Sequence, residues 1–117
     1  MMTTQMTLNL GEGSVRFNFS PEAAQKLQAA LGELMTSLKA IATTQASAGK
    51  KTQPEKTLEY QHTGEVFLEV FCNPNIWPTP FAAKLLLTIR DDRIRLTTEA
   101  ELTRILEDLN QYLEQTA

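Results

Sequence analysis

The sequence predicts an α+β domain: a mostly antiparallel sheet of about six strands with two amphipathic helices on one face. Three observations lead to this prediction. Several short stretches alternate apolar and polar residues, which is the pattern of half-buried strands. Two longer stretches instead repeat apolar residues at helical spacing. Along the chain these stretches follow the order ββα-ββ-ββα.

A β-hairpin is expected near the N-terminus. Its apolar residues alternate with polar ones on both sides of a glycine-containing turn; they are Met6, Leu8, Leu10, Val15, Phe17 and Phe19. A two-residue turn at Glu12-Gly13 would place Leu10 opposite Val15, and Gly13 can supply the positive φ that such turns need.

A long helix should follow this hairpin. The Ser20 hydroxyl can cap a free backbone N–H, and Pro21 is pre-set for the first helical position. An apolar stripe at helical spacing then carries the helix from residue 21 to the low forties. The stripe consists of Ala23, Leu27, Ala30, Leu31, Leu34, Leu38 and Ile41.

Residues 43–56 are polar and contain no periodic apolar residue, so they are expected to form a flexible linker within a single domain of residues 1–117.

A second strand pair is expected over residues 58–72. A loop of residues 62–64 would place Tyr60 opposite Val66, with Gly64 in a left-handed bulge position. One long strand bent at Gly64 is the alternative.

The C-terminal third predicts another hairpin and helix. Residues 84–90 and 93–97 read as strands joined at Asp91-Asp92, with Ile94 and Leu96 facing inward. Thr98 and Glu101 fit a capping box. The helix stripe consists of Leu102, Ile105, Leu106, Leu109 and Leu113.

The first and last ββα units match without a gap at an offset of 79 residues, which places Leu85 on Met6 and Leu106 on Leu27. Two interpretations stay open: a pseudo-twofold duplication, or the pattern that any two amphipathic ββα units share.

Composition narrows the class of protein. The 117 residues are 42% apolar and 21% charged, near the globular average. Cys72 is the one cysteine, so an intramolecular disulfide is excluded. The first ten residues lack the features of a signal peptide, and no apolar run approaches the length of a membrane span. We therefore expect a cytoplasmic protein.

No catalytic or metal-binding arrangement is expected. His62 and Cys72 are the only histidine and thiol, and their assignment to a turn and to the core is favoured over a catalytic pair. Two such ligands are too few for a zinc site. Asp91-Asp92 suits a tight turn. We expect a non-enzymatic protein without metal or cofactor; an enzyme with a small pocket between helices and sheet is a lesser hypothesis.

Residues 73–81 combine three prolines with apolar and aromatic side chains, which gives a stiff backbone large contact area. They favour a non-catalytic interaction module, an adaptor or assembly factor that binds a protein surface or peptide tail. The candidate binding residues of this loop are Ile76, Trp77 and Phe81. Phe67 and Phe71 join them because they lie on the strand parity opposite the buried one, on an otherwise largely polar sheet face that Leu86 shares. The alternative for the three loop residues is that they close the end of the core. Homodimerisation through open sheet edges is also expected to be feasible.

Charge gives the alternative function. The formal net charge of −3 argues against a general nucleic-acid binder. A basic hairpin nevertheless precedes the acidic last helix, and it could contact nucleic acid through Lys84, Arg90, Arg93 and Arg95. Solvated surface charges are the simpler interpretation of these residues.

Overall fold

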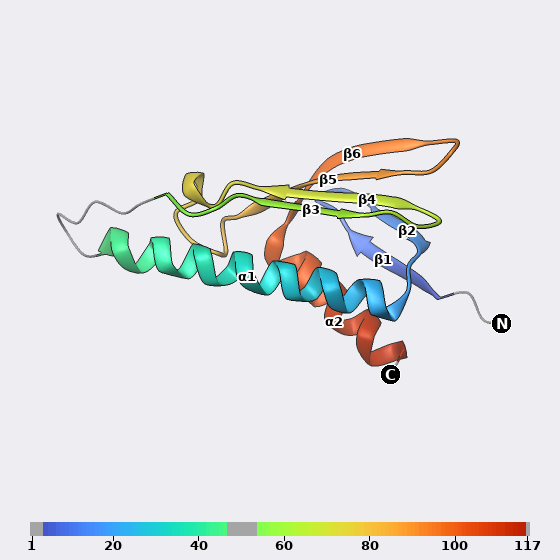
Figure 1. The fold of residues 1–117 in the computed structure, drawn as a ribbon, viewed down its shortest axis with the longest axis horizontal. Coiled ribbons are helices and arrows are strands. Elements are labelled where there is room, and N and C mark those ends of the chain that lie inside the picture. The colour runs from blue at the N-terminus through green and yellow to red at the C-terminus, as the bar shows by residue number, and fades with distance from the viewer. Residues whose placement is uncertain (1–3, 47–53, 117) are drawn as a thin grey trace.

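The computed structural model describes residues 4–46 and 54–116. Its two α-helices are α1 (Pro21–Ala46) and α2 (Leu102–Thr116). A short 3₁₀ helix, η1, spans Pro74–Ile76. The strands are β1 (Gln5–Asn9), β2 (Ser14–Asn18), β3 (Leu58–His62), β4 (Phe67–Cys72), β5 (Lys84–Arg90) and β6 (Arg95–Glu101). Figure 1 shows both helices on the same side of the β3–β6 strands.

The predicted α+β class is confirmed, but the single six-stranded sheet is not. The strands form two antiparallel sheets, a β1-β2 hairpin and a four-stranded sheet in the order β3-β4-β5-β6. α2 packs against β1, and the Asn9 amide of β1 donates a hydrogen bond to the Asp108 carboxylate of α2. Part of the β1 edge is therefore satisfied by a helix rather than by another strand.

α1 begins where the sequence predicts. The Ser20 hydroxyl accepts a hydrogen bond from the Ala23 amide at 3.1 Å, which is the expected N-terminal cap. The helix continues to Ala46, so it includes the first residues of the predicted linker. Residues 47–53 lie outside the described part of the chain. Glu55 is paired with Asn75, whose side chain both donates to and accepts from the Glu55 backbone at 2.8 Å.

One apolar core joins the two sheets and both helices. The inner face of the four-stranded sheet contributes alternate residues of its central strands, including Leu68, Val70, Leu85 and Leu87. Phe19 connects this region to the first hairpin, since its ring makes an edge contact with the His62 ring at a centroid distance of 4.9 Å.

Two hairpin registers differ from the predicted ones. Val15 pairs with Leu8 rather than Leu10, because residues 10–13 form a longer turn in which Gly13 has a φ of 92°. Tyr60 pairs with Val70 rather than Val66. Both changes shift the pairing by an even number of residues. The inward face therefore keeps the same residues, and the sequence pattern does not distinguish the registers.

The last strand is longer than predicted, and the capping box is not formed. Thr98 and Glu101 belong to β6, and α2 starts at Leu102. Ile94, expected to face inward, is exposed in the turn before β6. Gly64, expected at a left-handed position, does not have a positive φ. Pairing of β6 with β5 along seven residues outweighs the local capping signal.

The duplication is not confirmed. The equivalent pairs Asn9↔Ser14 and Arg90↔Arg95 differ by 81 residues (90 − 9), as do the helix starts (102 − 21), instead of 79. An offset of 81 would align buried Leu27 with buried Asp108. The two units share their element order, and the predicted residue-by-residue match at an offset of 79 is not confirmed.

Candidate interaction surfaces

The outer face of the four-stranded sheet carries an exposed apolar pair. Phe71 on β4 and Leu86 on β5 are cross-strand partners, and their side chains are 37% and 43% exposed. Their neighbours in sequence face the core, so strand alternation directs this pair away from the helices. The sheet therefore holds the pair on a rigid support.

Acidic side chains surround this pair. Glu59 lies opposite Phe71, and Glu99 lies opposite Leu86 on the other side. A hollow of about 310 Å³ is lined by Glu59, Gln61, Glu69, Phe71 and Leu86. The Gln61 side-chain amide donates to the Glu69 carboxylate at 2.8 Å. We call this hollow and its five lining residues the outer-face site; it offers an apolar floor with negative charge beside it.

Phe67 lies farther along the same face and already has a partner within the chain. The Arg90 guanidinium carbon is 4.3 Å from the centre of the Phe67 ring, within the range of a cation–π interaction. This contact covers part of the ring. Phe67 is therefore less available than Phe71 for contact with another molecule.

Trp77 differs from Ile76 and Phe81 in packing against the apolar core. It is half-buried and packs against the core, and its backbone amide donates to the Pro74 carbonyl of η1. Burial raises the pKa of the neighbouring Cys72 thiol, and a hydrogen bond from the Trp77 side chain lowers it to a smaller extent. Ile76, the residue before it, is exposed.

Phe81 projects from the same loop and is 81% exposed. It borders an apolar groove of about 470 Å³ between the loop and the C-terminal half of α1, lined by Met35, Lys39, Ala42, Thr43, Pro80 and Phe81. α1 lies on the helix-covered side of the molecule (Figure 1). The predicted binding residues are therefore distributed between the outer face of the sheet, the core and the α1 side.

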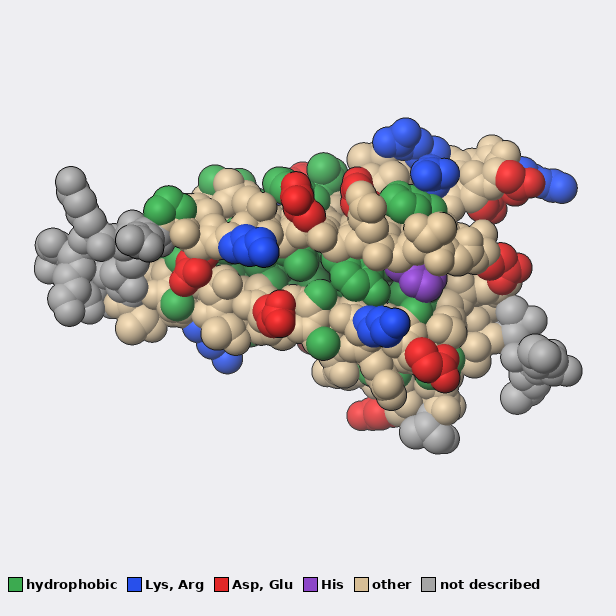
Figure 2. Space-filling view, in the orientation of Figure 1, with side chains coloured by type: hydrophobic (Ala, Val, Ile, Leu, Met, Phe, Trp, Pro, Cys, Tyr) green, Lys and Arg blue, Asp and Glu red, His purple; other side chains and the backbone are tan. Residues whose placement is uncertain are grey.

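The basic residues of the alternative function are also divided. Arg90 and Arg95 are cross-strand partners at one end of β5–β6, next to Arg93 in the turn. Lys84 is at the other end of β5, opposite Glu101 and about 20 Å away at the rise of an extended strand. Figure 2 shows Lys and Arg side chains at the upper right, over the hairpin, with acidic side chains nearby.

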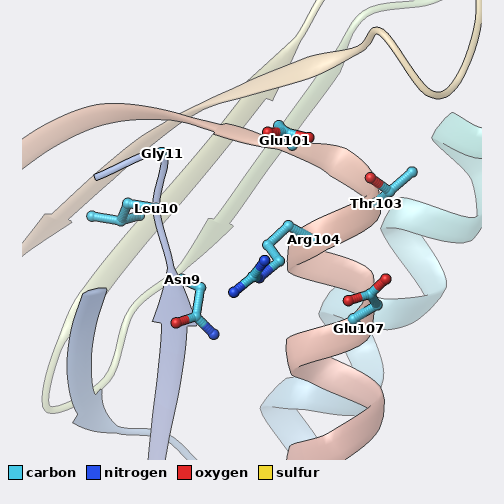
Figure 3. Close-up of a pocket in the computed structure, with 7 residues that line it drawn as sticks. All are labelled: Asn9, Leu10, Gly11, Glu101, Thr103, Arg104 and Glu107. Atoms are coloured by element: carbon cyan, nitrogen blue, oxygen red, sulfur yellow. The ribbon is translucent and has the colours of Figure 1, made fainter. Parts of the chain in front are cut away.

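Two polar features of α2 are not indicated by the pattern of the sequence. A cavity of about 240 Å³ lies between β1 and the start of α2, and the Arg104 side chain extends into it toward Asn9 and Leu10 (Figure 3). Asp108, only 6% exposed, accepts hydrogen bonds from the Asn9 amide and side chain at 2.7 and 2.8 Å. The partners are 99 residues apart in sequence, so no local pattern indicates them.

The geometry separates the two residues that could have formed a catalytic pair. His62 lies opposite Leu68, whereas Cys72 lies opposite Leu58 at the other end of β3. Among residues 4–46 and 54–116, no group of three or more His, Cys, Asp or Glu side chains is placed to hold a metal ion.

None of the described helices is long and apolar enough to span a membrane.

No protein-family model matches this chain, and no curated protein does so either.

Proposed function

We propose that this protein is a small non-catalytic interaction module, an adaptor or assembly factor, that binds a segment of another protein on the outer-face site. The observation that carries the proposal is the exposed Phe71–Leu86 pair beside the Glu59 and Glu69 carboxylates. Apolar area on a rigid sheet loses little entropy on binding, and the acidic side chains favour a positively charged partner. The partner segment should combine an aliphatic or aromatic side chain with lysine or arginine.

Ile76 and Phe81 are a secondary part of this proposal. Their exposure supports a contact role, but they belong to η1 and to the loop beside α1 rather than to the outer-face site. We therefore assign the main contact to Phe71 and Leu86. A variant that changes Ile76 and Phe81 then serves as a matched control, because it removes similar exposed apolar area elsewhere.

Selection of peptides from a random phage-displayed library against the full chain tests the proposal. The enriched peptides should contain an apolar residue next to Lys or Arg. The Phe71→Ala, Leu86→Ala double variant should bind them about tenfold more weakly or worse, since central apolar contacts carry most interface energy. Glu59→Lys should also weaken their binding through charge repulsion.

The control is the Ile76→Ala, Phe81→Ala double variant, which should keep the affinity of the wild type for these peptides. Circular dichroism should show that all variants remain folded. The proposal fails if no peptide is enriched, or if the enriched peptides bind the Phe71→Ala, Leu86→Ala variant as tightly as the wild type.

Nucleic-acid binding through the basic residues is the second candidate. The clustering of Arg90, Arg93 and Arg95 favours it, but Asp91 and Asp92 lie in the same turn and Arg90 is already placed over Phe67. Titration of labelled single- and double-stranded oligonucleotides at low salt decides this candidate, because phosphate contacts are strongest there. Absence of binding at low salt would exclude it.

A further inference from the structure

One outer edge of the four-stranded sheet is formed by β6. β6 is the last strand of its sheet and pairs only with β5 among the described strands. Hydrogen bonds from Asp91 to Ile94 and from Leu102 to Ala83 fix which residues of this hairpin bond across it. Because such bonding alternates along an antiparallel pair, the even-numbered residues of β6 bond to β5. The backbone N–H and C=O groups of the odd-numbered residues therefore point outward; these residues are Arg95, Thr97, Glu99 and Glu101.

The charges along this edge have an ordered sequence. Arg95 begins the strand, whereas Glu99 and Glu101 end it. Within the chain, Arg95 is opposite Arg90, and like charges at opposed positions repel. In the described part of the chain, the side chains of Arg95, Glu99 and Glu101 form no hydrogen bond or ion pair. All three side chains are exposed, although Glu101 also borders the cavity that Arg104 enters. They can therefore contact a molecule that binds along the edge.

We infer that β6 is a homodimer interface, in which two copies pair antiparallel about a twofold axis at Thr98. This register uses all seven residues of the strand and places Arg95 of each copy opposite Glu101 of the other. It also matches outward-pointing backbone groups with each other, so both four-stranded sheets join into one of eight strands. A parallel arrangement would instead place like charges together.

The partner on this edge is a second copy of the chain, because β6 is complementary in charge to another β6 that runs in the opposite direction. Charged residues on edge strands ordinarily discourage pairing with other strands. Here the signs change from positive to negative along the strand, so antiparallel self-pairing converts repulsion into attraction. The interface shares no lining residue with the outer-face site, although Glu99 of β6 lies opposite Leu86 of that site. Its test measures the oligomeric state and does not depend on the proposed function.

Sedimentation equilibrium of the full chain over a wide concentration range provides the test. The mass should rise above the 13.1 kDa of one chain toward twice that value. Arg95→Glu and Glu101→Arg should each raise the dimer dissociation constant about tenfold or more, because each creates two like-charge pairs. An equimolar mixture of the two variants should dimerise again. In the mixed dimer, the β6 edge of the Arg95→Glu chain carries negative charge at positions 95 and 101. The β6 edge of the Glu101→Arg chain carries positive charge at both positions, so opposite charges face each other.

Two further variants separate this inference from a loss of folding. Thr97→Pro removes an outward N–H without removing a bond to β5, so it should abolish the dimer while the chain stays folded. The double swap Arg95→Glu, Glu101→Arg should restore dimerisation. A wild type that stays at 13.1 kDa throughout would overturn the inference. So would folded single variants that dimerise like the wild type, or whose mixture stays monomeric.

Discussion

At the residue scale, Asp108 links α2 to the first hairpin. Its carboxylate is buried and accepts both the backbone and the side-chain amide hydrogens of Asn9. A buried charge is tolerated only when such bonds compensate for its lost hydration. These contacts also satisfy a backbone group at the edge of β1, which leaves that part of the edge unavailable to another strand.

Asp108→Ala should therefore lower the free energy of unfolding by about 3 kcal/mol, because it leaves the Asn9 donors without their acceptor. Urea unfolding followed by circular dichroism measures this loss. Asp108→Asn keeps one oxygen acceptor and should lose less, whereas Asp92→Ala in an exposed turn should change little. Equal effects of Asp108→Ala and Asp92→Ala would contradict this assignment.

The same residue shows what sequence reasoning omits. Leu102, Ile105 and Leu109 follow the helical stripe and are all buried as expected. Aspartate is a residue type that is usually solvated, so the sequence predicts an exposed position for Asp108. Only the tertiary placement of Asn9 makes its burial favourable. Patterns of one helix record its apolar face, but they do not record a polar partner contributed by a distant strand.

At the scale of elements, the turn between β5 and β6 organises itself around Asp91. Its carboxylate accepts backbone hydrogen bonds from Ile94 at 2.9 Å and from Arg93 at 2.8 Å. These bonds, that from Ile94 first, lower the pKa of the Asp91 carboxyl from its usual value of 3.8. The sequence predicted a turn here from the local bonding of aspartate, and the turn is present.

This pKa shift predicts a pH dependence with a definite sign. A carboxyl whose folded pKa is below its unfolded value stabilises the fold above about pH 4, and loses that contribution as the pH falls through the folded pKa. The stability difference between wild type and Asp91→Ala should therefore shrink on acidification, and NMR titration should give a low Asp91 pKa. A difference that stays constant between about pH 2 and about pH 6 would contradict the prediction.

The elements themselves were largely predictable, but their pairing was less so. Ser20 and the following apolar stripe predicted α1 because its start signal is local. The registers of Leu8 with Val15 and of Tyr60 with Val70 depend on turn lengths, and alternation is equally satisfied by shifts of two or four residues. For the candidate surface, Phe71 was found from its strand parity. Trp77 could not be assigned, because an apolar loop residue suits either a core or an interface.

At the scale of the whole molecule, the single core predicts a single unfolding transition. The core includes Met6 of the small sheet and Leu85 of the large one, and both helices contribute to it. Loss of any one layer exposes the apolar face of the next, so the two sheets should unfold together. Trp77, the one tryptophan, follows β4 and η1 in the chain, so its fluorescence reports on that end of the large sheet.

Met6→Ala tests this cooperativity from the small sheet. Met6 is fully buried, so its truncation should lower the free energy of unfolding by about 2 to 5 kcal/mol. The loss should appear equally in Trp77 fluorescence and in circular dichroism, with the two urea transitions coinciding. If fluorescence kept the wild-type midpoint while circular dichroism shifted, the sheets would unfold separately. Coincident transitions would instead mean that a change in β1 is transmitted through the shared core to the sheet that carries both proposed interfaces.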